Sequence, residues 1–169
     1  INGPWAEFMA NFKVNYSLEQ VAPGNDFARV HSWGKHDPGT YQSARHWVDK
    51  HFLDHGLPYL ADPSREWTSL GSDDLQSFHL HLVRKYGWDL YRNWFRVYAE
   101  LGDGDLKRPR SPEDKINLNC AVVSAVTGDD LVPYFQTWRM PVTEEGVAEM
   151  NERYPIGDAA AKVAEELES

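Results

Sequence analysis

Residues 72–102 read SDDLQSFHLHLVRKYGWDLYRNWFRVYAELG, and this stretch decides the fold class. Its apolar residues return every three or four positions, which is the spacing of one face of an α-helix. Two glycines, Gly87 and Gly102, divide and end the pattern, as glycines do after the last turn of a helix. The stretch therefore predicts two consecutive helices, over about 72–87 and 89–101.

The rest of the chain carries the same helical punctuation. Ser72 and Ser111 stand where a side-chain oxygen can cap a helix, and Pro112 suits the first helical turn. Gly56 is expected to end a helix before a proline-rich connection. No segment alternates between apolar and polar residues as a half-buried strand does. The further helices are expected over about 2–20, 38–55, 112–128, 130–138, 143–153 and 158–168.

These patterns predict a mainly α fold, a compact multi-helix domain of six to eight helices. Residues 1–155 are expected to form a single helical domain, or the C-terminal part of a larger catalytic domain. Residues 156–169 are expected to form a C-terminal helical tail.

The composition excludes several classes of protein. The 169 residues contain 17 Lys+Arg against 26 Asp+Glu, a formal charge of −9. An acidic chain is a poor general nucleic-acid binder, because phosphate contacts need clustered basic residues. No apolar run approaches the roughly 20 residues that span a bilayer, so no membrane span is expected. The single cysteine, Cys120, excludes an intrachain disulfide and is expected to be buried.

One candidate metal site lies at His51 and His55, four residues apart on an expected helix. Histidines at this spacing face the same way and can bind one metal ion. The alternative is a helix C-terminus where histidine is favoured by the helix dipole. No third ligand follows from the spacing.

A second candidate is Glu7, which stands beside the apolar pair Phe8 and Phe12 in the first expected helix. Asn11 follows one turn later and could orient the carboxylate. An unpaired charge is costly to bury, so Glu7 is either exposed to solvent or held by partners from elsewhere. In the second case it is a candidate metal ligand.

The remaining histidines and aromatic residues allow two interpretations. His79 is expected at the edge of the core and His81 on the surface, since they point to different faces of one helix. The aromatic residues of the middle and end of the chain either fill the core or line a groove for a peptide or a sugar.

Two stretches resemble a known family: YGWDLYRNWFRVY (86–98) and SAVTGDDLVPYFQTWRMPV (124–142). Both are similar to parts of the enhancin-like, mucin-degrading zinc metallopeptidases. The resemblance covers about residues 75–145 and, more faintly, 5–12. It implies the catalysis of that family, in which His-Glu-x-x-His and a downstream Glu hold zinc and the motif Glu activates water.

This sequence contains no His-Glu-x-x-His, and Glu7 is the residue that could match the downstream ligand. The resemblance therefore implies a C-terminal helical portion that completes the cleft, supplies a third zinc ligand and is inactive alone. The other zinc ligands would lie outside this chain, in a preceding catalytic segment of the same protein. A protein or glycoprotein substrate and a secreted or cell-surface location are also implied. The alternative is a non-catalytic helical module that binds peptide or glycan through an aromatic groove.

Overall fold

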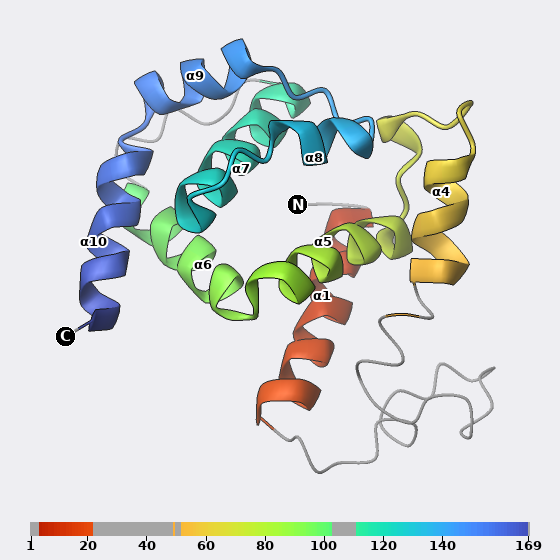
Figure 1. The fold of residues 1–169 in the computed structure, drawn as a ribbon, viewed down its shortest axis with the longest axis horizontal. Helices are drawn as coiled ribbons and strands as arrows, with labels where there is room; N and C mark the ends of the chain where they lie inside the picture. The colour runs from red at the N-terminus through yellow and green to blue at the C-terminus, as the bar shows by residue number, and fades with distance from the viewer. Residues whose placement is uncertain (1–3, 22–48, 50–51, 103–110, 169) are drawn as a thin grey trace. The chain divides into compact units, whose positions relative to one another are not determined.

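The computed structural model describes residues 4–21, 49, 52–102 and 111–168, and these residues form helices and no strand (Figure 1). The prediction of a mainly α fold is confirmed. Three short helical segments accompany the α-helices: the π-helices η1 (Ser17–Val21) and η2 (Phe52–Gly56), and the 3-10 helix η3 (Trp67–Ser69). The described α-helices are α1 (Pro4–Tyr16), α4 (Leu57–Ala61), α5 (Ser72–Tyr86), α6 (Asp89–Leu101), α7 (Pro112–Thr127), α8 (Val132–Thr137), α9 (Glu144–Arg153) and α10 (Ile156–Glu168).

The chain divides into two compact units, residues 1–81 and 82–169, and the border falls within α5. In the first unit, α1 packs on α5 through aromatic rings. Phe8 and Phe12 of α1 are buried, and so is Phe78 of α5. Burial of such rings stabilises a helix pair more than its intrinsic propensity does.

The second unit is built around α7, whose residues from Ile116 to Val123 are all buried. Helices α6, α9 and α10 pack against α7, and α10 also packs against α6 (Figure 1). Ile156, Ala159 and Val163 are the buried residues of α10, at the spacing of one helix face. The predicted boundary at residue 155 stays a prediction.

Local signals place most of the helix ends correctly. Ser111 caps α7 by accepting a hydrogen bond from the backbone N of Asp114 at 3.0 Å. Gly87, Gly102 and Gly128 follow α5, α6 and α7 with positive φ angles of 78°, 70° and 72°. Such angles cost glycine least, because it has no Cβ.

Two expected helix ends differ from the structure. Gly56 does not end a helix: its dihedral angles are helical (φ −63°, ψ −47°), and α4 follows it directly. A glycine is needed there for space, since a Cβ would lie 2.6 Å from the Phe52 ring and 2.9 Å from Ser77 Cβ. At the start of α5, the capping contact is made by Asp74 and not by Ser72, because the Asp74 carboxylate accepts from the backbone N of Gly71 at 2.9 Å. The helix expected over 38–55 lies largely outside the described residues.

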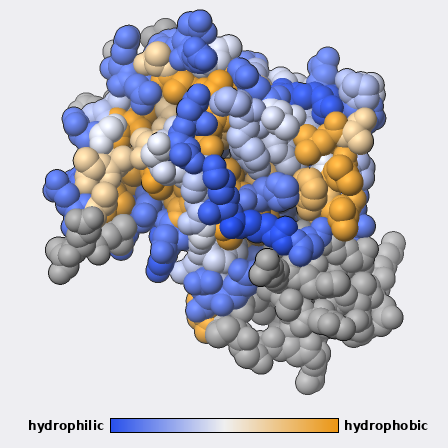
Figure 2. Space-filling view, in the orientation of Figure 1, coloured by the Kyte–Doolittle hydropathy of each residue, from blue (hydrophilic) through white to orange (hydrophobic). Residues whose placement is uncertain are grey.

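Figure 2 shows an apolar area at its right, where α4 lies. Leu53 of η2 and Leu57 of α4 are exposed and stand four residues apart in the sequence. None of the helices in the described part of the chain has the length and apolar character that crossing a membrane requires.

Candidate functional site

Helix α1 carries the candidate ligand Glu7 and continues that face with two buried amides. Asn11 and Asn15 follow at intervals of four residues, and they are only 8% and 1% exposed. Helix geometry places residues four apart on one face, so position 7 heads this polar stripe. Within the described residues, neither amide atom of Asn15 has a hydrogen-bond partner, which is a costly arrangement for a group needed only for packing.

A cluster of aromatic rings holds the neighbouring face of α1 against α5. The His79 imidazole stacks on the Phe8 ring, with centroids 4.3 Å apart and an interplanar angle of 15°. Phe78 meets the imidazole edge-on at 4.8 Å, and Phe12 lies further away at 6.0 Å. Phe8 is the residue next to Glu7, so this cluster anchors the part of α1 that carries the candidate ligand.

Both histidines of α5 are more buried than the sequence suggested. His79 has no exposed surface at all, although it was expected at the edge of the core. Loss of hydration lowers the pKa of His79 to about 3, so its imidazole is neutral at physiological pH. His81 was expected on the surface, but it is half-buried because it stacks on Phe52 at 4.1 Å. Partial burial also lowers the pKa of His81.

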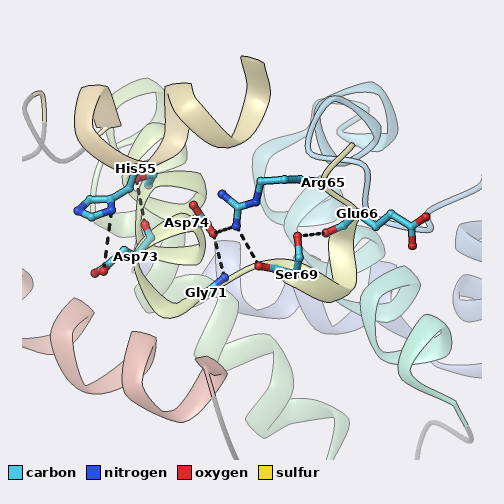
Figure 3. A network of polar contacts seen from close by, with 8 residues as sticks. His55, Arg65, Glu66, Ser69, Gly71, Asp73 and Asp74 are labelled. Carbon is cyan, nitrogen blue, oxygen red and sulfur yellow. Dashed lines mark hydrogen bonds and ion pairs between the residues drawn. The ribbon is translucent and has the colours of Figure 1, made fainter. Parts of the chain in front are cut away.

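The N-terminus of α5 is surrounded by a network of polar contacts (Figure 3). The Asp74 carboxylate accepts from Arg65 Nη2 at 2.7 Å, and the same guanidinium donates to the Ser69 carbonyl at 2.9 Å. Arg65 also lies over the Tyr59 ring, 4.6 Å from its centroid. These contacts attach the loop between α4 and α5 to the start of α5. No sequence signal points to Arg65, and the signal for Asp74 is its place as an acidic residue in the first turn of α5.

The second predicted metal site is described only in part. His51 lies outside the described residues. His55 lies in η2 with its Nδ1 4.0 Å from an Asp73 carboxylate oxygen (Figure 3). Among the residues that the structure describes, no group of three or more His, Cys, Asp or Glu side chains could hold a metal ion. Metal binding by His51 and His55 therefore stays a prediction.

In the second unit, the half-exposed carboxylate of Asp129 has two side-chain donors. It accepts hydrogen bonds from Tyr86 Oη at 2.6 Å and Lys85 Nζ at 2.9 Å. These two donors hold the pKa of Asp129 below its usual value. Asp130, its neighbour, accepts from the backbone N of Val132 at 3.0 Å at the start of α8. Asp129 therefore contacts the last residues of α5, whereas Asp130 caps the start of α8.

The large rings of the second unit are mostly in its core. Trp88, Trp94 and Trp138 are buried, whereas Phe95 on α6 is 46% exposed.

Cys120 is buried on α7 as expected, and burial raises the pKa of its thiol to about 12. A thiol in that state is a packing residue with little nucleophilic character at neutral pH.

The donor set limits what this chain can offer a zinc ion. Protein zinc sites use three or four side chains, of which a carboxylate is commonly one. A glutamate on α1 fits the supply of one such ligand. The described residues do not assemble the others.

Residues 28–139 match the family described as peptidase M60, enhancin and enhancin-like. The match covers about two thirds of the chain. The chain belongs to this family. The resemblance read from residues 86–98 and 124–142 is thus confirmed, and the chain is a peptidase-related module. Comparisons with curated proteins and with solved structures give no match. Glu7 precedes the matched segment, and His51 and His55 fall within it.

Proposed function

We propose that this chain is the C-terminal helical portion of a zinc-dependent metallopeptidase of the M60 family, and that Glu7 is its third zinc ligand. The observation that carries the proposal is the position of residue 7. It heads the stripe of buried amides on α1 and stands next to Phe8, which is stacked on α5. Membership of the family supplies the reason to expect zinc.

The histidine ligands must then come from another part of the same protein. None of the seven histidines of this chain is followed by Glu, so the His-Glu-x-x-His motif is not in this sequence. We place the motif in a preceding catalytic segment, which makes the chain inactive alone. Its substrate is a protein or glycoprotein.

In this proposal the chain contributes one carboxylate, that of Glu7, as a zinc ligand, together with the helices that hold α1. Bound zinc would supply a polarised water for attack on a peptide carbonyl. The aromatic cluster keeps α1 packed on α5.

The proposal is tested by Glu7→Gln in the protein that includes the preceding segment. We expect the variant to lose zinc and proteolytic activity while its far-UV circular dichroism stays unchanged, because the amide is nearly isosteric but a poor zinc ligand. Glu144→Gln is the matched control, since Glu144 is exposed on α9 in the other unit. Full zinc content and activity in Glu7→Gln would exclude the assignment.

The alternative function is binding of peptide or glycan without catalysis. The exposed ring of Phe95 is the observation that favours it, since most other large rings of that unit are buried. Binding of peptide or glycan by the isolated chain that survives a chelator and is lost in Phe95→Ala would support it.

If His51 and His55 form a zinc site of their own, the purified chain should hold one zinc ion. That ion should be lost in the double variant His51→Ala, His55→Ala.

A further inference from the structure

The outer face of α6 carries two arginines around an exposed aromatic ring. Arg92, Phe95 and Arg96 stand at positions i, i+3 and i+4, which lie on one side of a helix, and all three are exposed. The buried residues of α6, among them Trp94 and Val97, lie on the opposite side. We call Arg92, Phe95 and Arg96 the arginine stripe. It is a cationic surface on a chain whose net charge is −9.

The outer face of α9 has the same spacing with the opposite charge. Glu145, Ala148 and Glu149 take the i, i+3 and i+4 positions, Glu152 follows at i+7, and all four are exposed. We call these four residues the glutamate stripe. At the position where the arginine stripe has Phe95, the glutamate stripe has a small alanine. Two carboxylates therefore flank a position with room for an aromatic ring.

The ion pairs that the two stripes form within the chain are local. Arg92 pairs with Asp89 on α6, and Glu149 pairs with Arg153 on α9, so each pair stays within one helix. Exposed pairs of this kind are weak, because water and salt screen them. Arg153 also has its Nη1 3.4 Å from an Asp114 carboxylate oxygen. It therefore keeps an anionic partner when Glu149 turns to another cation.

Arg96 and Glu145 are the charges that the described fold leaves without an ion pair. Among the residues that the structure describes, neither side chain forms one. Both α6 and α9 pack on α7 with their other faces, so the two stripes are left exposed. An arginine and a carboxylate can form a pair with two hydrogen bonds, and arginine and aromatic residues are enriched at protein interfaces.

We propose that the partner of these surfaces is a second copy of this chain, with the arginine stripe of one copy on the glutamate stripe of the other. The charges are opposite, the spacing is the same, and Ala148 leaves room for the Phe95 ring. A two-fold dimer makes this contact twice, because the symmetry gives each stripe its counterpart on the other copy. The inference goes beyond the proposed function and does not depend on Glu7.

The first test is sedimentation equilibrium of the 169-residue chain at several protein concentrations. We expect a reversible equilibrium between monomer and dimer. Its dissociation constant should rise by about tenfold between about 0.05 M and 0.5 M salt, because the interface depends on exposed charges. Arg96→Glu should raise it by about tenfold or more, since like charges then face each other. Lys115→Glu is the matched control, because it reverses an exposed cation on α7 outside both stripes, and it should stay within about twofold of the parent.

The second test exchanges the charges of the two stripes. One double variant carries Arg92→Glu and Arg96→Glu, and the other carries Glu145→Arg and Glu149→Arg. Each should be monomeric by itself, because both of its contacts join like charges. An equimolar mixture of the two should form dimers again, since every contact between them joins opposite charges. Circular dichroism checks that both variants are folded. If one is not, Phe95→Ala replaces it and should weaken the dimer by about tenfold, as loss of an aromatic anchor does.

The outcomes decide the proposal. A chain that is monomeric at every concentration and salt would overturn it, and binding of an acidic peptide by that monomer would assign the arginine stripe to a different protein. A dimer that persists in both double variants would place the interface elsewhere and would also overturn it. Assemblies that grow beyond two copies would overturn the two-fold arrangement. Dimers in the mixture, and in neither double variant alone, would establish the contact between the two stripes.

Discussion

Arg65 and Asp74 form a close ion pair that attaches the loop after α4 to the first turn of α5. Nη2 of Arg65 lies 2.7 Å from the Asp74 carboxylate, and the side chains are 30% and 9% exposed. The same carboxylate oxygen accepts from the backbone N of Gly71. Asp74 therefore both neutralises a cation and accepts the capping hydrogen bond at the start of α5, and the first of these tasks requires its negative charge.

Replacing Asp74 by Ala should destabilise the chain by about 2 kcal/mol. The change leaves a partly buried guanidinium without its carboxylate and the first turn of α5 without its cap. Unfolding in urea measures the difference. Glu66→Gln is the control in the same loop, because Glu66 is exposed, and it should stay within about 0.5 kcal/mol of the parent. Equal effects of the two substitutions would show that the pair contributes nothing.

Gly146→Ala should be destabilising, although alanine is the better helix former. A Cβ at position 146 would lie 2.6 Å from the Asn117 side-chain oxygen. That side chain links α7 to the start of α9: its oxygen accepts from the Thr143 backbone N at 3.2 Å, and its nitrogen donates to the Glu113 carbonyl at 3.1 Å. We expect a loss of about 1–3 kcal/mol from overpacking.

Gly157→Ala is the control for Gly146→Ala, because an added Cβ at position 157 meets no other side chain. It lies in α10, and no atom would come within 4 Å of an added Cβ. Helix propensity then acts alone and should stabilise the chain by up to about 1 kcal/mol. Both variants are measured by the same urea titration. A stabilised Gly146→Ala would mean that Asn117 can move without loss.

Much of the fold could be predicted from the sequence, because its signals are local. The glycines at 87, 102 and 128 end helices through their own backbone freedom, and Ser111 caps α7 through an atom three residues from its partner. Such features need no knowledge of the rest of the chain. The family was read in the same way, from short stretches that include Gly87 and Gly128.

What could not be predicted depends on residues far apart in the sequence. His79 is completely buried because α1 brings Phe8 and Phe12 over it. Gly56 lies inside a helical run, where a glycine is needed because Phe52 and Ser77 leave no room for a Cβ. Glu7 was selected from its apolar neighbours and the resemblance, but the contacts that anchor its helix belong to α5.

Arg139→Gly should be more stable than Arg139→Ala by about 1 kcal/mol. Arg139 has a φ of 56°, in the left-handed region, directly after the last residues of α8. Its backbone N donates to the Gln136 carbonyl at 2.8 Å, and the N of Met140 donates to the Phe135 carbonyl at 3.1 Å. This is the helix-ending motif in which glycine is preferred. Comparison with alanine isolates the backbone effect, because both variants lack the arginine side chain. Thermal unfolding should give a higher midpoint for Arg139→Gly than for Arg139→Ala. Equal midpoints would argue against backbone strain at position 139.

His79 should make the stability of the chain depend on pH between about 7 and 5. The folded state keeps the imidazole neutral down to a pKa of about 3, whereas the unfolded chain takes up a proton near its ordinary value of 6.5. The unfolded state therefore binds more protons below pH 6.5, and stability falls as the pH is lowered, by up to about 1.4 kcal/mol per pH unit. Above pH 6.5 both states are neutral, and this contribution to the slope disappears.

The comparison that isolates this effect is between the parent chain and His79→Gln. Glutamine does not titrate, and the other histidines are common to both proteins, so the difference between the two pH slopes belongs to His79. Most carboxylates titrate below this range. We expect the free energy of unfolding to fall more steeply from pH 6.5 to pH 5 in the parent, whatever the absolute stability of the variant. Parallel slopes would mean that His79 can be protonated in the folded chain, which its position between Phe8 and Phe78 argues against.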